Sequence, residues 1–212
     1  MLLAMDDQSN AGVLFLHGWN SSRRGYLPRA RAVEDDCGAT CLTFDLAGHG
    51  ENASRPASEF SPRQHLAEAV AKHDELAACT GVDPARIGVC GASYGAYLAA
   101  LLVGERPVAG LLLRAPALYP DAAIDAPPRD RRAGVEQPAN ALALRNLAAF
   151  GGPVALVESE RDEVIPHAVV EAYLDACPQA RHTVIPGAAH SLSDPAWNEA
   201  FLTEILAWAR TL

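Results

Sequence analysis

A serine flanked by two glycines stands near the middle of the chain, in the run Gly91-Ala92-Ser93-Tyr94-Gly95. The apolar residues before Gly91 predict a strand, and those after Gly95 predict a buried helix. A nucleophilic serine needs a tight strand-to-helix turn that exposes its hydroxyl, and flanking glycines remove the Cβ atoms that would clash there. The start of the helix would also favour a developing negative charge beside Ser93. Ser93 is therefore a candidate nucleophile, and the alternative is a glycine-rich turn that only packs.

The elements that would position Ser93 follow from an alternation of strand and helix signals along the chain. Short apolar or β-branched runs predict strands at residues 13–16, 40–45, 86–91, 110–114, 153–158 and 181–185. Amphipathic or apolar segments predict helices that begin near Pro28, Pro62, Gly95, Ala139, Pro166 and Pro195. Strands alternating with helices form parallel βαβ units, so we expect a parallel sheet covered by helices on both faces.

Length and composition limit the class of protein. A chain of 212 residues is long enough for one sizeable core and short for two, so we expect a single domain over residues 1–212. Half of the residues are hydrophobic, and one fifth are charged, as in soluble globular proteins. The net charge is −9, and the short Arg129 to Arg132 region is the main basic cluster. This balance argues against nucleic acid and anionic membranes as partners.

The amino terminus and the cysteines indicate a cytoplasmic protein. Residues 1–7 lack a basic region followed by an apolar core, which a secretory signal requires, and no run reaches membrane-spanning length. The five cysteines are an odd number without metal-ligand spacing, so we expect buried free thiols. A disulfide between Cys37 and Cys41 is the alternative, because they lie four positions apart across a turn.

These signals together resemble the α/β-hydrolase family over nearly the whole chain. The resemblance implies an α/β fold with a mostly parallel sheet of about six strands and a short insertion, residues 115–150, before the acid-bearing strand. In this family the nucleophile is followed along the chain by an acid and then by a histidine. His190 lies in a loop after the last expected strand, in Pro186-Gly187-Ala188-Ala189-His190, which is similar to the family's histidine loop. The resemblance therefore implies that His190 is the catalytic base.

The acid is expected just past the strand at residues 153–158. Asp162 matches the aspartate of the family's G-x-x-D turn, which precedes an apolar residue and a proline. The glycine of that turn is replaced here by Ser159. The carboxylates that compete with Asp162 for this role are Glu158, Glu160 and Glu163.

The segment after the first strand is similar to the family's oxyanion loop. It reads His17-Gly18-Trp19, and in the family the residue after the glycine and the residue after the nucleophile donate their backbone N–H groups to the oxyanion. The corresponding residues are Trp19 and Tyr94. The alternative is that His17-Gly18 merely ends a strand. The run from Asp45 to Gly50 also matches a family turn, whose role is structural.

The resemblance implies a serine hydrolase that cleaves small carboxylic esters through an acyl-enzyme, with Ser93, His190 and Asp162 as a triad. This mechanism requires neither a metal nor an organic cofactor. The chain is nearest in appearance to dienelactone-hydrolase-like and prolyl-oligopeptidase-like esterases. The alternatives are an acyl-peptide or other amide hydrolase, a thioester hydrolase, and a non-catalytic interaction protein with the same fold.

The insertion contains a segment, Tyr119 to Pro138, that is rich in proline, aspartate and arginine. It leaves the sheet at the edge where the nucleophile is expected, so we expect it to cover the mouth of the site and to limit acyl size. The alternative is a solvated loop without contact to substrate.

Overall fold

A six-stranded sheet forms the centre of the molecule in the computed structural model, which describes residues 10–126 and 140–212. The strands lie in the order β2-β1-β3-β4-β5-β6, and every neighbouring pair is parallel. Their bounds are β1 Asn10–Leu16, β2 Thr40–Thr43, β3 Val82–Ala92, β4 Gly110–Arg114, β5 Val154–Ser159 and β6 Arg181–Ile185. The strand order changes direction between β1 and β3, and the crevice at such a switch point is where parallel sheets bind ligands.

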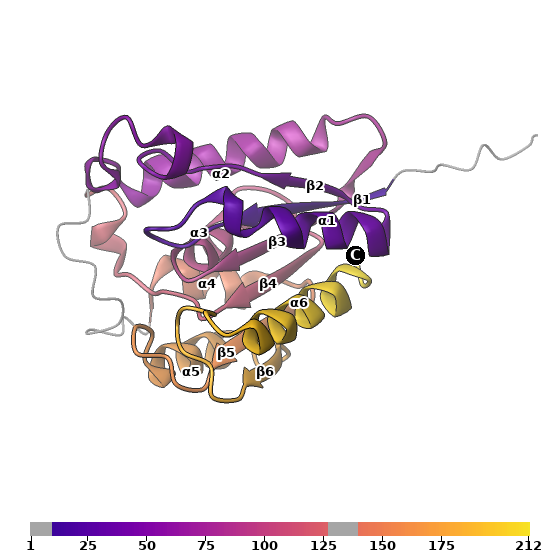
Figure 1. Cartoon of the computed structure of the whole chain (residues 1–212). Helices are drawn as coiled ribbons and strands as arrows, with labels where there is room; N and C mark the ends of the chain where they lie inside the picture. The colour runs from indigo at the N-terminus through magenta and orange to yellow at the C-terminus, as the bar shows by residue number, and fades with distance from the viewer. Residues whose placement is uncertain (1–9, 127–139) are drawn as a thin grey trace, which may run out of the picture.

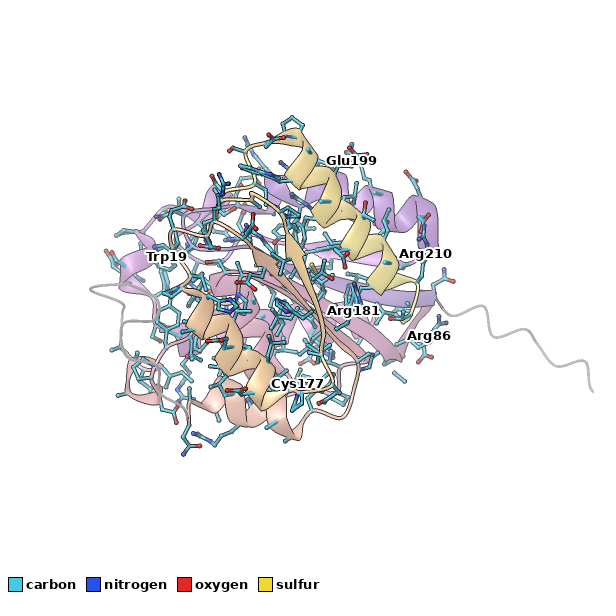
Figure 2. All side chains as sticks on the ribbon, turned by 90° about the horizontal axis from the view of Figure 1, so that it is seen from below. Trp19, Arg86, Cys177, Arg181, Glu199 and Arg210 are labelled. Atoms are coloured by element: carbon cyan, nitrogen blue, oxygen red, sulfur yellow. The ribbon has the colours of Figure 1, made fainter. Side chains whose placement is uncertain are left out.

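Helices cover both faces of this sheet (Figure 1). Their bounds are α1 Leu27–Cys37, α2 Pro62–Ala77, α3 Tyr94–Leu102, α4 Leu142–Ala149, α5 His167–Ala176 and α6 Pro195–Ala209. Helices α1 and α6 pack on one face, and α2, α3, α4 and α5 pack on the other. Figure 2, seen from below, places α5 and α6 on opposite sides of the sheet. The predicted α/β architecture is confirmed.

Alternate residues of each strand feed two apolar cores. In β1, Val13 and Phe15 pack with α1 and α6, while Leu14 and Leu16 pack with α2 and α3. All four side chains are buried, because both faces of the sheet are covered. A strand of this kind has no polar face, and this explains why the sequence reads as continuous apolar runs rather than as alternating ones.

Local capping signals set the helix starts. The Ser61 side chain accepts a hydrogen bond from the N–H of Gln64, and the Gln64 side chain accepts one from the N–H of Ser61, a reciprocal capping box at the start of α2. Asp194 caps α6 by accepting the N–H of Ala196. Gly38 ends α1 in the left-handed conformation, with φ of 66°.

Three strands differ from their expected bounds by two residues or more. β1 begins at Asn10 rather than at residue 13, and β3 begins at Val82 rather than at residue 86, with a register shift between the two strands. β2 ends at Thr43 rather than at residue 45, and the Asp45 carboxylate beyond it accepts the N–H groups of Arg23 and Glu51. All of these differences lie at the ends of strands.

The insertion is described in part. The expected helix at its end is present as α4, whereas residues 127–139 lie outside the described residues, so most of the segment from Tyr119 to Pro138 stays an expectation. At its start, the Tyr119 ring packs against the rings of Tyr94 and Tyr97, with centroid distances of 6.1 and 4.9 Å. Asp121 pairs with Arg145 across the gap.

All five cysteines are free thiols, so the alternative disulfide is not formed. Cys90 and Cys177 are buried as expected, whereas the other three are half-buried. Among the described residues, the helices are too short or too polar to cross a lipid bilayer. Over the same residues, no three His, Cys, Asp or Glu side chains are grouped as metal ligands.

Candidate active site

Ser93 lies in the sharp turn between β3 and α3. Its backbone has φ of 54° and ψ of −116°, a conformation that side-chain-bearing residues rarely adopt. The flanking glycines allow the turn: a Cβ at Gly91 would lie 2.4 Å from the Gly95 carbonyl oxygen, and one at Gly95 would lie 2.1 Å from the Leu16 carbonyl oxygen. These close approaches hold the turn against the end of β1, and they explain why the serine sits between glycines.

His190 and Asp162 lie in line with this serine, although 97 residues separate Ser93 from His190 in the chain. The His190 Nε2 atom is 3.1 Å from the Ser93 Oγ atom. On the other side of the ring, Nδ1 is 2.8 Å from Asp162 Oδ2 and 3.0 Å from Oδ1. The structure thus brings together the three residues that the sequence singled out, each from the loop after a different strand.

The contacts of Asp162 define the tautomer of His190. The carboxylate accepts the N–H groups of Val164 and Ile165 at 2.9 and 2.7 Å. Burial alone would raise the pKa of Asp162, but the hydrogen bonds from His190 and Ile165 and the charge of His190 outweigh it, so the pKa is lowered. An ionised carboxylate only accepts, so Nδ1 carries the proton, and Nε2 is left as the acceptor that faces the Ser93 hydroxyl.

The histidine loop is tied down at both peptide groups of His190. Its N–H donates to Glu163 Oε2 at 3.0 Å, and its carbonyl oxygen accepts from Arg114 Nη2 at 2.5 Å. Glu160 accepts the N–H of Gly187 at the start of the same loop. The two glutamates that competed with Asp162 in the sequence therefore bind the loop backbone, while Asp162 alone of the three contacts the ring.

Ser159, which stands where the family has glycine, uses its side chain to bind Arg114. Its hydroxyl is buried and accepts from Arg114 Nη2 at 2.7 Å. The same guanidinium nitrogen reaches the carbonyl oxygens of Ala189 and His190. The hydroxyl thus links the turn after β5 to the histidine loop through Arg114. Glu158, the remaining competitor, points elsewhere and binds His167 and His182.

The loop after β1 packs directly on the serine. A Cβ at Gly18 would lie 3.3 Å from the Ala92 carbonyl oxygen and 3.4 Å from the Ser93 Cβ atom. The rings of Trp19 and Tyr94 meet edge to face, with centroids 5.4 Å apart. His17 fixes the base of this loop, since its Nε2 accepts the Leu46 N–H at 3.1 Å and its Nδ1 lies 2.8 Å from the Gly18 carbonyl oxygen. Trp19 and Tyr94 therefore both lie beside Ser93, and their assignment to the oxyanion hole stays a prediction.

A pocket of about 300 Å³ opens over Ser93. Figure 2 shows Trp19, one of its residues, at the end of the sheet opposite to Arg86, which lies near the start of β3. The pocket is lined by Gly18, Trp19, Ser21, Gly25, Tyr26, Arg29, Ala92, Ser93, Arg114, His190, Ser191, Leu192, Asn198 and Phe201.

Two arginines of this pocket, Arg29 and Arg114, were not singled out from the sequence. The available signal for Arg114 was a charged residue at the carboxyl end of an otherwise apolar strand, Gly-Leu-Leu-Leu-Arg. Arg29 gave no such signal, because a half-exposed arginine on an amphipathic helix is common.

The chain belongs to the alpha/beta hydrolase family, whose sequence model matches residues 13–142. Two uncharacterised proteins from Mycobacterium tuberculosis strains are 30% identical to it over 188 residues, which are 86% of this chain and 64% of theirs. The chain thus spans less than two thirds of the length of these relatives.

Solved structures give the same fold. A structure of the metagenome-derived lipolytic enzymes LipS and LipT has a TM-score of 0.75 at 20% identity, over 97% of this chain and 95% of that one. Monoacylglycerol lipase from Paleococcus ferrophilus has a TM-score of 0.73 at 15% identity, over 94% of each chain. The thioesterase domain of the curacin biosynthetic pathway has a TM-score of 0.70 at 17% identity, over 94% of this chain and 92% of that one. The family match and these structures together show the α/β-hydrolase fold.

Proposed function

We propose that the protein is a serine hydrolase that cleaves small carboxylic esters through an acyl-enzyme. The observation that carries the proposal is the line of hydrogen-bonding distances from Ser93 Oγ through the His190 ring to the Asp162 carboxylate. These distances lie within the range over which a general base takes a proton from a hydroxyl. The half-buried, strained turn at Ser93 supports the same assignment, because such strain gathers at functional sites.

The mechanism follows from these roles. His190 Nε2 takes the Ser93 proton as the hydroxyl oxygen attacks the ester carbonyl carbon, and Asp162 stabilises the imidazolium that forms. The backbone N–H groups of Trp19 and Tyr94 bind the oxyanion of the tetrahedral intermediate. His190 then returns the proton to the alkoxide that leaves, and an acyl-enzyme remains on Ser93. Water, activated by the same histidine, releases the acid.

The size of the pocket supports a small substrate. A volume of about 300 Å³ is at the lower end for ligand sites, and its walls combine Trp19, Tyr26 and Phe201 with polar groups. Hydrolysis of an amide or a thioester would use the same residues, so these substrates are compared with esters below. The remaining alternative is a non-catalytic interaction protein, and labelling with a fluorophosphonate probe tests it.

Labelling with a fluorophosphonate probe, followed by peptide mass spectrometry, tests the nucleophile. We expect modification of Ser93 and hydrolysis of p-nitrophenyl acetate, both lost in Ser93→Ala, with kcat reduced by roughly 10⁶-fold as for loss of other serine nucleophiles. Ser191→Ala is the matched control, because Ser191 lines the same pocket without contacting His190 Nε2. Folded wild-type protein that is not labelled, or labelling that persists in Ser93→Ala, would contradict the proposal.

A panel with one acyl group tests the bond that is cleaved. We expect the acetate ester to give a higher kcat/KM than the acetyl amide and the acetyl thioester of similar leaving-group size. A higher value for the thioester or amide would reassign the substrate class while leaving the nucleophile in place.

A further inference from the structure

Arg114 is a buried cation at the edge of the catalytic pocket. Its side chain is only 6% exposed, and it ends β4 directly beside Ala92 of β3. One nitrogen, Nη2, donates to Ser159, Ala189 and His190, all through neutral oxygens. The Nε atom is buried without a hydrogen-bond partner among the described residues. A buried guanidinium usually faces a carboxylate, because a buried charge is costly unless it is paired. Within residues 10–126 and 140–212, no carboxylate lies within 4.0 Å of it.

Arg29 brings a second guanidinium to the same pocket from α1. It lies over the rings of Tyr26 and Phe201, with distances of 5.5 and 5.3 Å from its central carbon to the ring centroids. It donates to the Gly25 carbonyl oxygen and to Asn198 Oδ1. A guanidinium has five N–H donors, so these two bonds fix its plane and leave others for a ligand. In the described part of the chain it too has no carboxylate within 4.0 Å, although Glu199 lines the adjoining hollow.

The charge of the pocket is therefore positive in a protein whose net charge is −9. Burial lowers the pKa of Arg114; the charges of Asp162 and Glu163 oppose this, and the charge of Arg29 adds to it. Both guanidiniums line the same pocket as Ser93. Asp162 and Glu163 bind His190 and are not among the residues that line the pocket. The pocket wall therefore presents two guanidiniums and no carboxylate, which suits a negatively charged group of the substrate.

We propose that this pocket is a carboxylate subsite: the ester that the protein hydrolyses carries a carboxylate, bound by Arg29 in the field of Arg114. The inference rests on the proposed function for the bond that is cleaved. Arg29 is the binding residue, because its fork is fixed on two aromatic rings with donors to spare. Arg114 is a positioning residue for the histidine loop that also supplies charge. A fixed guanidinium fork matches a carboxylate through two parallel hydrogen bonds.

Two pairs of esters test the proposal, each differing only in the negative charge. In the first pair the group varied lies in the acid part of the ester: monomethyl succinate carries a carboxylate there, and methyl 4-oxopentanoate carries an acetyl group. In the second pair it lies in the alcohol part: acetoxyacetate carries the carboxylate, and acetoxyacetone carries the acetyl group. We expect wild-type kcat/KM to favour the anionic member of at least one pair by roughly tenfold, because a charged hydrogen bond contributes about 1.5 kcal/mol or more. Arg29→Gln should abolish this preference while the neutral esters are still hydrolysed, and Arg29→Lys should restore part of it.

Arg31→Gln is the matched control, because Arg31 is an exposed residue of α1 that does not line the pocket. The proposal is overturned if wild type hydrolyses the esters but discriminates in neither pair, or if Arg29→Gln and Arg31→Gln keep the same preference. Calorimetric titration of Ser93→Ala with monomethyl succinate separates binding from chemistry. If Arg29→Gln weakens the binding of monomethyl succinate tenfold, the subsite is supported even when no ester is turned over. The absence of turnover would contradict only the proposed function. If Ser93→Ala binds methyl 4-oxopentanoate as tightly as monomethyl succinate, the carboxylate subsite is overturned.

Discussion

At the scale of single residues, the Asp162 carboxylate is the group on which the state of His190 depends. Asp162→Asn would place an amide where the ring N–H now donates, and an amide nitrogen facing Nδ1 would favour the wrong tautomer. We expect kcat to fall by roughly 10³ to 10⁴-fold, as in the corresponding change of other triads, with little loss of stability. Ester hydrolysis and thermal unfolding measured on the same samples check both parts.

Glu163→Gln and Glu160→Gln are the controls for this change. Each keeps a side-chain oxygen that can accept the loop N–H it now binds, at His190 or Gly187. We expect both variants to retain most of the activity. If Glu160→Gln were the more damaging change, the acid of the site would be assigned to the wrong carboxylate.

His17, in the loop after β1, should make the stability of the protein depend on pH. The His17 Nε2 atom accepts the Leu46 N–H. Protonation of Nε2 would turn it into a donor that faces this N–H, and the loss of the hydrogen bond would cost about 1 to 3 kcal/mol. Burial lowers the pKa of His17 more than the Gly18 carbonyl and the Asp45 charge raise it. The unfolded chain, with an ordinary histidine pKa near 6.5, therefore binds the proton more readily. Stability is full above that pH and declines below it.

Urea unfolding at pH 7.5 and 5.5 measures this decline. The His17→Gln variant keeps an acceptor for the Leu46 N–H but cannot titrate, so its free energy of unfolding should change less between the two pH values. An equal change in wild type and His17→Gln would assign the decline to other groups.

At the scale of elements, the turn from β3 to α3 depends on the contact between Gly95 and β1. Gly95→Ala would place a methyl group 2.1 Å from the Leu16 carbonyl oxygen, and the three nearest atoms are all backbone atoms of Leu16 and His17. We expect a loss of about 3 kcal/mol or more, the upper range for overpacking. Gly151→Ala, whose added Cβ would have no atom within 4 Å, should be nearly neutral. Denaturant midpoints of the two variants decide the comparison, and a stable Gly95→Ala would mean that the turn can shift.

The elements themselves could be predicted because their signals are local. Ser61 with Pro62, and Asp194 with Pro195, mark helix starts through contacts that span three residues or fewer. The register shift of β3 against β1 could not be predicted, because it depends on pairing between residues that are far apart in the chain.

The same distinction applies to the candidate site. Ser93, Asp162 and His190 were found from short motifs, and the structure places them in contact. The role of Arg114 could not be found this way, since it joins the end of β4 to a loop 76 residues further along. Long-range contacts between polar groups leave no periodic pattern in the sequence.

At the scale of the whole molecule, paired carboxylates should govern stability in acid. For both Asp45 and Asp162, burial alone would raise the pKa, but the groups donating to them lower it overall. A depressed folded-state pKa contributes stability that is present above the unfolded value, near 3.9, and is lost as the pH falls through the folded value. We expect the free energy of unfolding to fall steeply below about pH 4.

Asp45→Asn tests this attribution, with Asp74→Asn as control. Asp74 is an exposed partner of Arg106, and exposed pairs contribute little. The unfolding free energy of Asp45→Asn should depend less on pH between 5 and 3 than that of Asp74→Asn. Parallel curves for the two variants would show that the buried carboxylate is not responsible.

The backbone at Ser93 also has a consequence for stability. Its φ of 54° and ψ of −116° suit glycine, and holding a larger residue there costs on the order of 1 to 3 kcal/mol. Substitution by glycine would remove this cost. The greater conformational freedom of glycine in the unfolded chain would offset less than about 1 kcal/mol of the stability gained. Ser93→Gly should therefore be more thermostable than the natural protein and chemically silent. Selection for heat resistance alone would favour glycine at this position, so stability and activity compete at this one residue.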